Sequence, residues 1–144
     1  MHSSIFRQLI IALAYSVAAT AASAQPVVDR LKRLTGDDSF NLLLDTQSIV
    51  LDGTKRRAWL IWDYITPQKL DGDPSTTFSS SKMRWIIDCK QQLAGLAVII
   101  HYEGQLGDGK IAYEKSPKEP LMSEIVPLSI GETIARNTCG VKKK

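Results

Sequence analysis

The sequence has 144 residues, with 18 lysines and arginines against 15 aspartates and glutamates, which gives a formal net charge of +3. Proteins that bind nucleic acid usually present a strongly basic face, so a charge balance this mild argues against a nucleic-acid partner. The length suits a single domain with one buried core.

The first 24 residues have the pattern of a secretory signal peptide. Arg7 supplies a positive charge, the apolar run "LIIALAYSVAAT" follows, and residues 22–24 form an A-x-A site. The apolar run is shorter than the roughly 20 residues that a membrane-spanning helix needs. We therefore expect residues 1–24 to be removed by cleavage between Ala24 and Gln25. The product is expected to be soluble, periplasmic or secreted, and without an integral membrane segment.

After the leader, hydrophobic patterning predicts a series of β-strands. Residues 27–34 fit either a helix, through apolar positions at helical spacing, or a strand that turns at "GDD" into the next one, and we favour the strand. Short strands are predicted at "FNLLLD" and "IVLDG". The strand "KRRAWLIWDYI" has apolar side chains on both faces, which is typical of a strand near the middle of a covered sheet.

A long polar loop is predicted at residues 66–77, which contain two prolines and one glycine. Such a loop could carry recognition, or it could be a surface insertion without a function. The next strand, residues 78–89, alternates with a period of two and places Met83, Trp85 and Cys89 on one face. Two more strands are predicted at "LAGLAVIIHYEG" and "GDGKIAYEK".

The C-terminal part of the chain is predicted to contain the one clear helix. Before it, three prolines exclude regular strand pairing, because proline donates no ladder hydrogen bond. Ser129 and Glu132 have the spacing of a capping box, so a helix is predicted over residues 130–137, with a glycine ending it. Ile130 and Ile134 are expected to lie on one apolar stripe.

The only two cysteines lie at the ends of predicted elements, Cys89 after a strand and Cys139 after the helix. In an exported chain they most simply form one disulfide, and two unpaired buried thiols are the alternative. A helix of about ten residues is not stable alone in water, so it must dock on an apolar surface such as the strand face that carries Trp85. Closing a loop of about fifty residues would contribute about 4 kcal/mol and hold the helix there.

Four segments, taken in order, resemble the surface-adhesin protein E-like family of Gram-negative bacteria. They are "LLLDTQSI", "AWLIWDYITPQ", "IIDCK" and "IVPLSIGETIARNTCG". The resemblance covers residues 30–140 and implies an α+β fold, in which an antiparallel sheet of about six strands carries a C-terminal helix tethered to one face by a disulfide. The adhesin-E-like domain would span residues 25–140, leaving a basic tail at residues 141–144.

The resemblance also assigns structural roles to particular residues. It implies Cys89 and Cys139 as the disulfide pair, and Asp45, Trp59 and Trp62 as positions of the scaffold. No binding residue is transferred from the family to this chain.

The family's named activity is the binding of host extracellular-matrix and serum proteins at the cell surface, so the resemblance implies a binding function. This chain has no cysteine near the predicted cleavage site that could carry a lipid anchor, and it has Leu121 and Met122 where relatives often carry an aromatic residue. We expect an exported, non-catalytic binding protein with a protein or glycan partner, which engages host matrix or envelope components.

No motif predicts a catalytic residue, a cofactor site or a metal site. His101 is the one histidine after the leader, and we expect a solvated or cross-strand residue that points away from the apolar face of its strand. The aspartates at residues 37–38, and Asp71 with Asp73, are better explained by turns than by acid–base chemistry. We therefore expect neither an enzyme nor a bound cofactor.

Two other functions stay open. A small disulfide-linked β domain could be a periplasmic inhibitor of a lysozyme or a protease, with residues 66–77 as the inhibitory loop. An enzyme could also assemble an acid–base pair across the fold. The tail Lys142–Lys144 could contact anionic lipid, glycan or an acidic protein, although a solvated tail is the simpler interpretation.

Overall fold

The computed structural model describes residues 30–141. The predicted signal peptide, its cleavage site between Ala24 and Gln25, and residues 142–144 of the predicted tail lie outside the described residues. Within residues 30–141, no helix is both long enough and apolar enough to cross a membrane.

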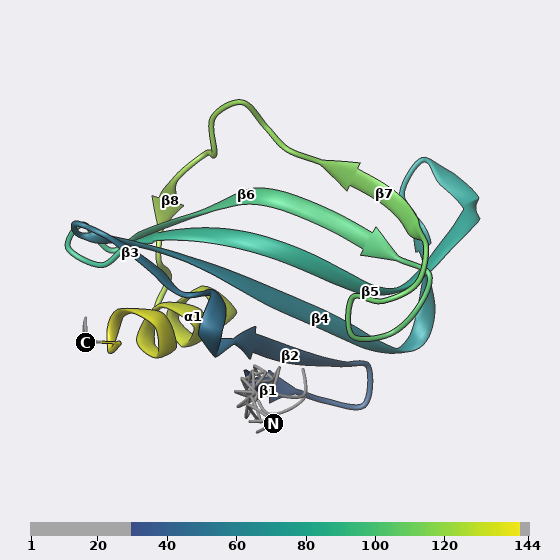
Figure 1. Ribbon diagram of the computed structural model, residues 1–144, viewed down its shortest axis with the longest axis horizontal. Coiled ribbons are helices and arrows are strands. Elements are labelled where there is room, and N and C mark those ends of the chain that lie inside the picture. The colour runs from purple at the N-terminus through teal and green to yellow at the C-terminus, as the bar shows by residue number, and fades with distance from the viewer. Residues whose placement is uncertain (1–29, 142–144) are drawn as a thin grey trace, which may run out of the picture.

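The described residues form one curved antiparallel sheet and one C-terminal α-helix (Figure 1). Six strands make a continuous path in the spatial order β1 (Leu31–Gly36), β2 (Phe40–Asp45), β4 (Lys55–Leu70), β5 (Asp73–Asp88), β6 (Leu93–Tyr102) and β7 (Ile111–Lys115). Beside this path, β3 (Val50–Asp52) pairs with β4, and β8 (Ser123–Glu124) pairs with β6. A short 3-10 helix, η2 (Thr46–Ser48), follows β2, and the helix is α1 (Ile130–Cys139).

The antiparallel sheet with a C-terminal helix agrees with the fold predicted from the sequence, but the strand count does not. The sheet of residues 30–141 has eight strands instead of the predicted count of about six. β3, of three residues, lies in the segment "IVLDG" for which a short strand is predicted, whereas β8, of two residues, is not predicted from the sequence. β8 forms in the proline-rich region because a two-residue pairing fits between the prolines, where every ladder donor is present. Residues 27–34 are expected to form a strand rather than a helix, and their described part does form a strand, the beginning of β1.

The predicted loop at residues 66–77 is wrong, because these residues form the ends of β4 and β5 and the tight turn between them. The register of β4 against β5 shifts between Asp63 and Gln68, so the segment that contains Pro67 has no direct partner in β5. Such a bulge accommodates a proline that cannot donate to the ladder. The turn itself uses Gly72, whose φ of 86° is readily adopted only by glycine.

The side of the sheet on which α1 packs is called the inner face here. Cross-strand pairing places Leu44 opposite Leu60, and Ile87 opposite Ala94, on this face. These four side chains belong to one buried cluster that also includes Ile134 of α1. Burial of apolar surface is the main stabilising term in folding, so this cluster is the principal contact that holds the helix on the sheet.

The helix contacts the sheet through its middle and last turns rather than along a stripe that begins at its first residue. Ile134, Ala135 and Thr138 are its buried residues, and Ile134 has no exposed surface. Ile130 is 40% exposed, so of the two isoleucines on the predicted stripe only Ile134 is buried against the sheet. Spacing places Ile130 and Ile134 on one side of the helix. A side chain is buried only where another element packs against it, and the sheet covers only the later turns of the helix.

The capping box at the start of α1 is present in a modified form. Ser129 is the N-cap, and its Oγ accepts a hydrogen bond from the Glu132 backbone N–H at 3.2 Å. The Glu132 carboxylate accepts from the backbone N–H of Leu128 at 2.7 Å, one residue before the N-cap. This bond lowers the pKa of Glu132, with a smaller contribution from Arg136. The predicted start at residue 130 is correct, and the helix continues to Cys139, two residues further than expected.

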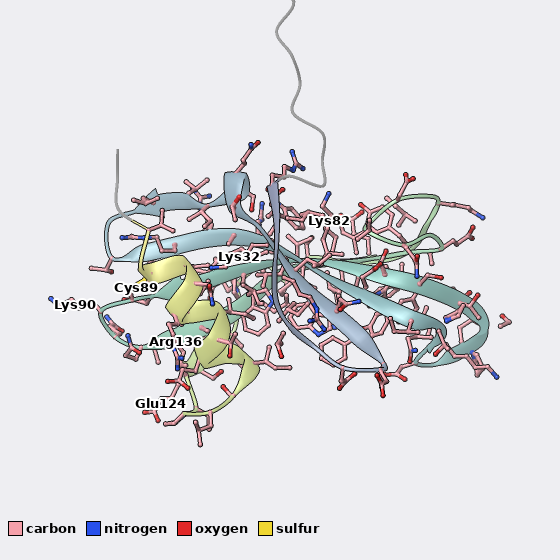
Figure 2. The ribbon with its side chains drawn as sticks, turned by 90° about the horizontal axis from the view of Figure 1, so that it is seen from below. Lys32, Lys82, Cys89, Lys90, Glu124 and Arg136 are labelled. Carbon is pink, nitrogen blue, oxygen red and sulfur yellow. A yellow bond between two sulfur atoms is a disulfide. The ribbon has the colours of Figure 1, made fainter. Side chains whose placement is uncertain are left out.

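The second end of the helix is joined covalently to the sheet. Cys89, directly after β5, forms a disulfide with Cys139, the last residue of α1, and their Cα atoms are 5.7 Å apart. Figure 2 shows Cys89 beside the helix. Lys32 of β1 adds a hydrogen bond from its Nζ to the side-chain oxygen of Asn137 at 2.9 Å. The helix is therefore attached to two strands far apart in the sequence.

The three positions assigned to the scaffold are structural in different ways. Asp45 is 5% exposed, caps η2 with its carboxylate, and forms an ion pair with Arg30 at 3.1 Å. Trp62 stacks on a second tryptophan of β5, with ring centroids 6.3 Å apart, and packs against the inner core cluster. Trp59 faces the other side of the sheet, the outer face, where the guanidinium carbon of Arg84 lies 5.7 Å from the centre of its ring.

Candidate binding groove on the inner face

Part of the inner face lies beyond the helix and forms a groove. The ends of β4 and β5 bend round toward β7 in Figure 1 and bound this region. The groove has a volume of about 570 Å³. Its apolar and aromatic lining consists of Tyr64, Leu70, Phe78, Met83, Leu96, Ile99, His101 and Tyr113. Its polar lining residues are Gln68, Lys69, Asp71 and Lys115. We call this feature the inner groove.

A second hollow of about 300 Å³ adjoins the inner groove. The two share Leu96, Ile99 and Lys115, and the second is completed by the chain segment that runs toward β8, including Leu121. Leu121 is 88% exposed, so its apolar side chain is available at the surface. The apolar floor therefore continues from the hairpin end along β6.

Four rings from four strands stand in a row in the inner groove. Tyr64 meets Phe78 edge to face at 5.6 Å, Phe78 stacks on His101 at 4.0 Å, and His101 stacks on Tyr113 at 5.5 Å, all between ring centroids. The last contact follows from the register, because His101 and Tyr113 are direct cross-strand partners in β6 and β7. Because each ring contacts its neighbour, the orientations of the four rings are restrained before any ligand binds.

His101 is buried at the centre of this row, with 9% of its surface exposed. Its Nδ1 is 2.7 Å from the Oγ of Ser81, its cross-strand partner in β5. Burial lowers the pKa of His101 because it disfavours the charged ring, and the charge of Asp71 opposes this effect. The ring is therefore held in its neutral form more strongly than a free histidine.

The prediction of a cross-strand position for His101 is confirmed, but the prediction of a solvated side chain pointing away from the apolar face is wrong. The reason is a bulge in β6. Trp85 pairs with Leu96 while Arg84 pairs with Val98, so Ala97 is an extra residue in this strand. The bulge shifts the alternation by one position and moves His101 to the same face as Leu96.

The serine and the histidine nearest the inner groove, Ser81 and His101, are bonded to each other below its surface. Ser81 has no exposed surface, so its hydroxyl cannot reach a substrate, and its bond to His101 satisfies two buried polar atoms. Asp71 is the single carboxylate in the lining of the inner groove. Within residues 30–141, no group of three or more histidine, cysteine, aspartate or glutamate residues is placed to hold a metal ion.

Two of the four aspartates near turns, Asp37 and Asp73, have the local roles expected from the sequence. Asp37 accepts hydrogen bonds from the backbone N–H of Ser39 at 2.7 Å and of Phe40 at 3.3 Å. Asp73 accepts from the hydroxyl groups of Ser75 and Thr76, and these bonds lower the pKa of Asp73. These hydrogen bonds stabilise the turns before β2 and at the start of β5. Turn formation therefore explains both aspartates without a role in ligand binding or acid–base chemistry.

Comparison with known proteins identifies the family of the chain. Residues 31–140 match the family described as surface-adhesin protein E. The chain belongs to the surface-adhesin protein E family. The family resemblance derived from the sequence segments is therefore confirmed, and membership supports a binding role of the adhesin type rather than an enzymatic one. No curated protein matches the chain in sequence.

Solved structures of another member support the fold of this family protein. The crystal structure of protein E from non-typeable Haemophilus influenzae has a TM-score of 0.60 and 17% identity, over 84% of this chain and 82% of that chain. A second crystal form of Haemophilus influenzae protein E has a TM-score of 0.61 and 16% identity, over 85% and 96% of the two chains. At these identities the likeness concerns the fold alone.

Sequence reasoning did not find the inner groove of this adhesin-E family protein. The available signals were aromatic residues in separate strands, such as Tyr64, Phe78 and Tyr113. Two bulges bring them together, one in β4 before Gln68 and one at Ala97. A bulge leaves no clear mark in the apolar pattern, so the sequence could not show that these rings share one surface.

Proposed function

We propose that this surface-adhesin protein E family member is an exported, non-catalytic binding protein that takes an extended segment of a partner protein in the inner groove. The partner would belong to the host matrix or to the bacterial envelope. The observation that carries the proposal is the combination of a rigid aromatic floor with the free edge of β7. Small numbers of polar groups around an apolar, preformed hollow are typical of ligand sites.

The free edge supports an extended segment rather than a compact ligand. Within residues 30–141, β7 is the last strand of the path and pairs on one side only, with β6. Unpaired backbone groups at such an edge can add a strand from a partner, with alternate side chains entering pockets beside the edge. Tyr113 and Lys115, two residues apart in β7, both line the inner groove, so its pockets follow the spacing of a strand.

The test uses a displayed library of linear peptides selected on the mature protein, followed by affinity measurements and amide hydrogen exchange. Tyr113→Ala should lower the affinity of selected peptides by about tenfold or more, because it removes a half-buried ring that lines the groove. Tyr113→Phe keeps the ring and should bind as the wild type does. Bound peptide should slow exchange in β7. Peptide affinity that is equal in the three proteins, with unchanged exchange in β7, would contradict the proposal.

The proposed location is the periplasm or the medium, after cleavage between Ala24 and Gln25. The leader pattern, with its apolar run and A-x-A site, supports this location. Fractionation of producing cells and N-terminal sequencing of the product provide the test. We expect Gln25 as the first residue, and recovery of the uncleaved chain with the cytoplasmic fraction would contradict it.

An inhibitor of a lysozyme or a protease is the second candidate function. The supporting observation is the projecting β4–β5 hairpin, whose turn is fixed by the hydrogen bonds of Asp73. A rigid projection loses little conformational entropy when it docks. Inhibition assays with lysozymes and periplasmic proteases separate the two functions. Inhibition that is lost when Lys69 and Asp71 are replaced by alanine, but kept in Tyr113→Ala, would favour the inhibitor.

A further inference from the structure

The outer face carries a row of basic side chains, none of which lines the inner groove. Register places Arg84 opposite Trp59 and Lys82 opposite Ile61, with Arg57 two residues before Trp59 on the same side of β4. In Figure 2, Lys82 lies on the upper side of the sheet, whereas Arg136 of α1 lies on the lower side. We call Arg57, Arg84 and Lys82 the outer basic row.

The three cations are evenly spaced along the strands. Residues two apart in a strand are separated by roughly 7 Å, and diagonal neighbours on adjacent strands by about 7–8 Å. Lys82 and Arg84 have the first relation, and Arg84 and Arg57 have the second. The row therefore offers three positive charges over roughly 14 Å along one direction of the sheet.

Two of these side chains are held in place by packing. The guanidinium of Arg84 lies over the ring of Trp59 at 5.7 Å. The stem of Lys82 lies against Gly107, where an added Cβ would be 3.3 Å from the lysine Cδ. The loop with Gly107 is itself anchored by a bond of 2.9 Å from its amide to Ser80 Oγ. Side chains that are already ordered lose less entropy when they bind a ligand.

The row has no acidic partner among the described residues. The ion pairs of residues 30–141 join Arg30 with Asp45, Lys110 with Glu103, and Arg136 with Glu132. Two carboxylates lie near the row without an ion pair to it: Asp63, the diagonal neighbour of Lys82, accepts from the Leu106 backbone N–H at 2.7 Å, and Asp52 lines a hollow together with Lys55 and Arg57. The three charges are left to attract an anion from outside.

A small hollow lies beside Arg57 and Arg84, toward one end of the row. It has a volume of about 150 Å³ and is lined by Ser48, Val50, Arg57, Ala58, Trp59 and Arg84. This volume is several times the roughly 30 Å³ that a water molecule occupies in the liquid, so a group of sulfate size has room. Two guanidinium groups beside one hollow suit an oxyanion, because each can donate paired hydrogen bonds.

We propose that the outer basic row binds a linear sulfated polysaccharide. One sulfate occupies the hollow between Arg57 and Arg84, the next anionic group along the polymer meets Lys82, and the ring of Trp59 contacts the apolar side of a sugar. A nucleic acid would call for a broader basic face. Anionic membranes usually recruit clusters of roughly four to eight cations, more than this row contains. The site is independent of the inner groove and does not rest on the proposed function.

The experiment measures binding of the mature protein to heparin oligosaccharides by calorimetry at several salt concentrations. We expect measurable binding at low salt that weakens as salt increases, since release of counterions contributes to it. Arg57→Gln with Arg84→Gln should lower the affinity about tenfold or more, because two charge-assisted hydrogen-bonding groups are lost. Lys90→Gln with Lys118→Gln removes the same charge from exposed sites elsewhere and should change the affinity less than about twofold.

Arg57→Gln alone provides a check that does not depend on folding, because Arg57 is exposed and makes no ion pair in the described part of the chain. It should weaken heparin binding while the melting temperature stays unchanged. Hyaluronan without sulfate, duplex DNA and phosphatidylserine vesicles are the comparison ligands, and each should bind more weakly than heparin. Equal binding to any of them, or equal loss in both double variants, would overturn the proposal, as would the absence of heparin binding by the wild type.

Discussion

At the scale of single residues, His101 shows how much a position depends on its neighbours. A period-two pattern gives each strand residue a face, but the extra residue Ala97 changes that assignment for everything after it. As a result, the His101 ring is buried between Phe78 and Tyr113, where burial favours its neutral form. A polar side chain is tolerated in this place because Ser81 supplies its hydrogen bond.

The first prediction concerns the titration of His101. Its pKa should lie below the ordinary value of 6.5, because burial disfavours the charged ring. Below that value the unfolded chain binds a proton that the folded chain does not, so the free energy of unfolding should fall as pH decreases from about 7 to 5. NMR titration of the mature protein gives the pKa. His101→Asn cannot titrate and should show a weaker pH dependence in urea unfolding, and a pKa at or above 6.5 would contradict this prediction.

Gly95 is a second residue whose role depends on a distant segment. A Cβ at this position would lie 2.7 Å from the Met122 sulfur and 2.8 Å from the carbonyl oxygen of Leu121. The backbone before β8 therefore passes directly over β6 at a point where only glycine fits. The sequence shows a glycine inside a strand, which predicts a close approach without naming the partner.

The second prediction follows from this contact. Gly95→Ala should destabilise the protein by about 1–3 kcal/mol, because the overlap involves backbone and the crossing segment must shift. Hydrogen exchange should become faster in β8, whereas β1 and β2 keep their protection and serve as the internal control. Unchanged stability together with unchanged exchange at Ser123–Glu124 would contradict the prediction, because the crossing segment would then accommodate the added methyl group without loss of stability.

At the scale of elements, α1 combines a strong local signal with a weak intrinsic stability. Ser129 and Glu132 determine where it begins. The bond from the Glu132 N–H to Ser129 is anticipated from the sequence, whereas the Glu132 carboxylate bonds the N–H of Leu128 instead of the N-cap. Its ten residues are too few for a stable isolated helix, so its formation depends on the contacts of Ile134, Ala135 and Thr138 with the sheet.

The third prediction compares the two isoleucines of α1. Ile134→Ala should lower the free energy of unfolding by about 2–5 kcal/mol, since it removes a fully buried side chain and leaves a cavity. Ile130→Ala is the matched control, because the same atoms are removed from a position that is 40% exposed. Its effect should stay below about 1 kcal/mol. Urea unfolding followed by circular dichroism measures both, and similar losses in the two variants would refute the assignment of the helix face.

The β4–β5 hairpin is the element that the sequence described least well. Its polar residues, two prolines and glycine are typical of a loop, yet both strands continue to a turn at Gly72. Pairing with a neighbouring strand outweighs weak local propensity when the bulge removes the need for a proline N–H. The same hairpin end provides Gln68, Lys69 and Asp71 to the inner groove.

At the scale of the whole molecule, the disulfide joins the last residue of the helix to the end of a central strand. Cys89 and Cys139 are 50 residues apart in the sequence, and both pack against the inner core cluster. The bond closes the part of the chain that contains β6, β7 and the segment to β8. It therefore restricts the unfolded chain over more than a third of the domain.

The fourth prediction is that reduction removes a large share of the stability. The chain-entropy model gives about 4 kcal/mol for a closed loop of this length, within a total that is usually about 5–15 kcal/mol. Urea unfolding of the mature protein with and without reductant measures the difference. Mass spectrometry with a thiol label should find neither cysteine modified before reduction. Labelling without reductant, or equal stability in both conditions, would contradict the structural role of the bond.

The amino-acid sequence by itself determined the β-rich class, the start of α1, the two cysteines at facing element ends and the family. These features are local, or depend on composition, so they can be read from spacing and residue type. Tertiary structure alone decided which side chains form the inner groove and the outer basic row. Both surfaces depend on strand register, and register is set by bulges and long-range pairing that involve residues far apart in the chain.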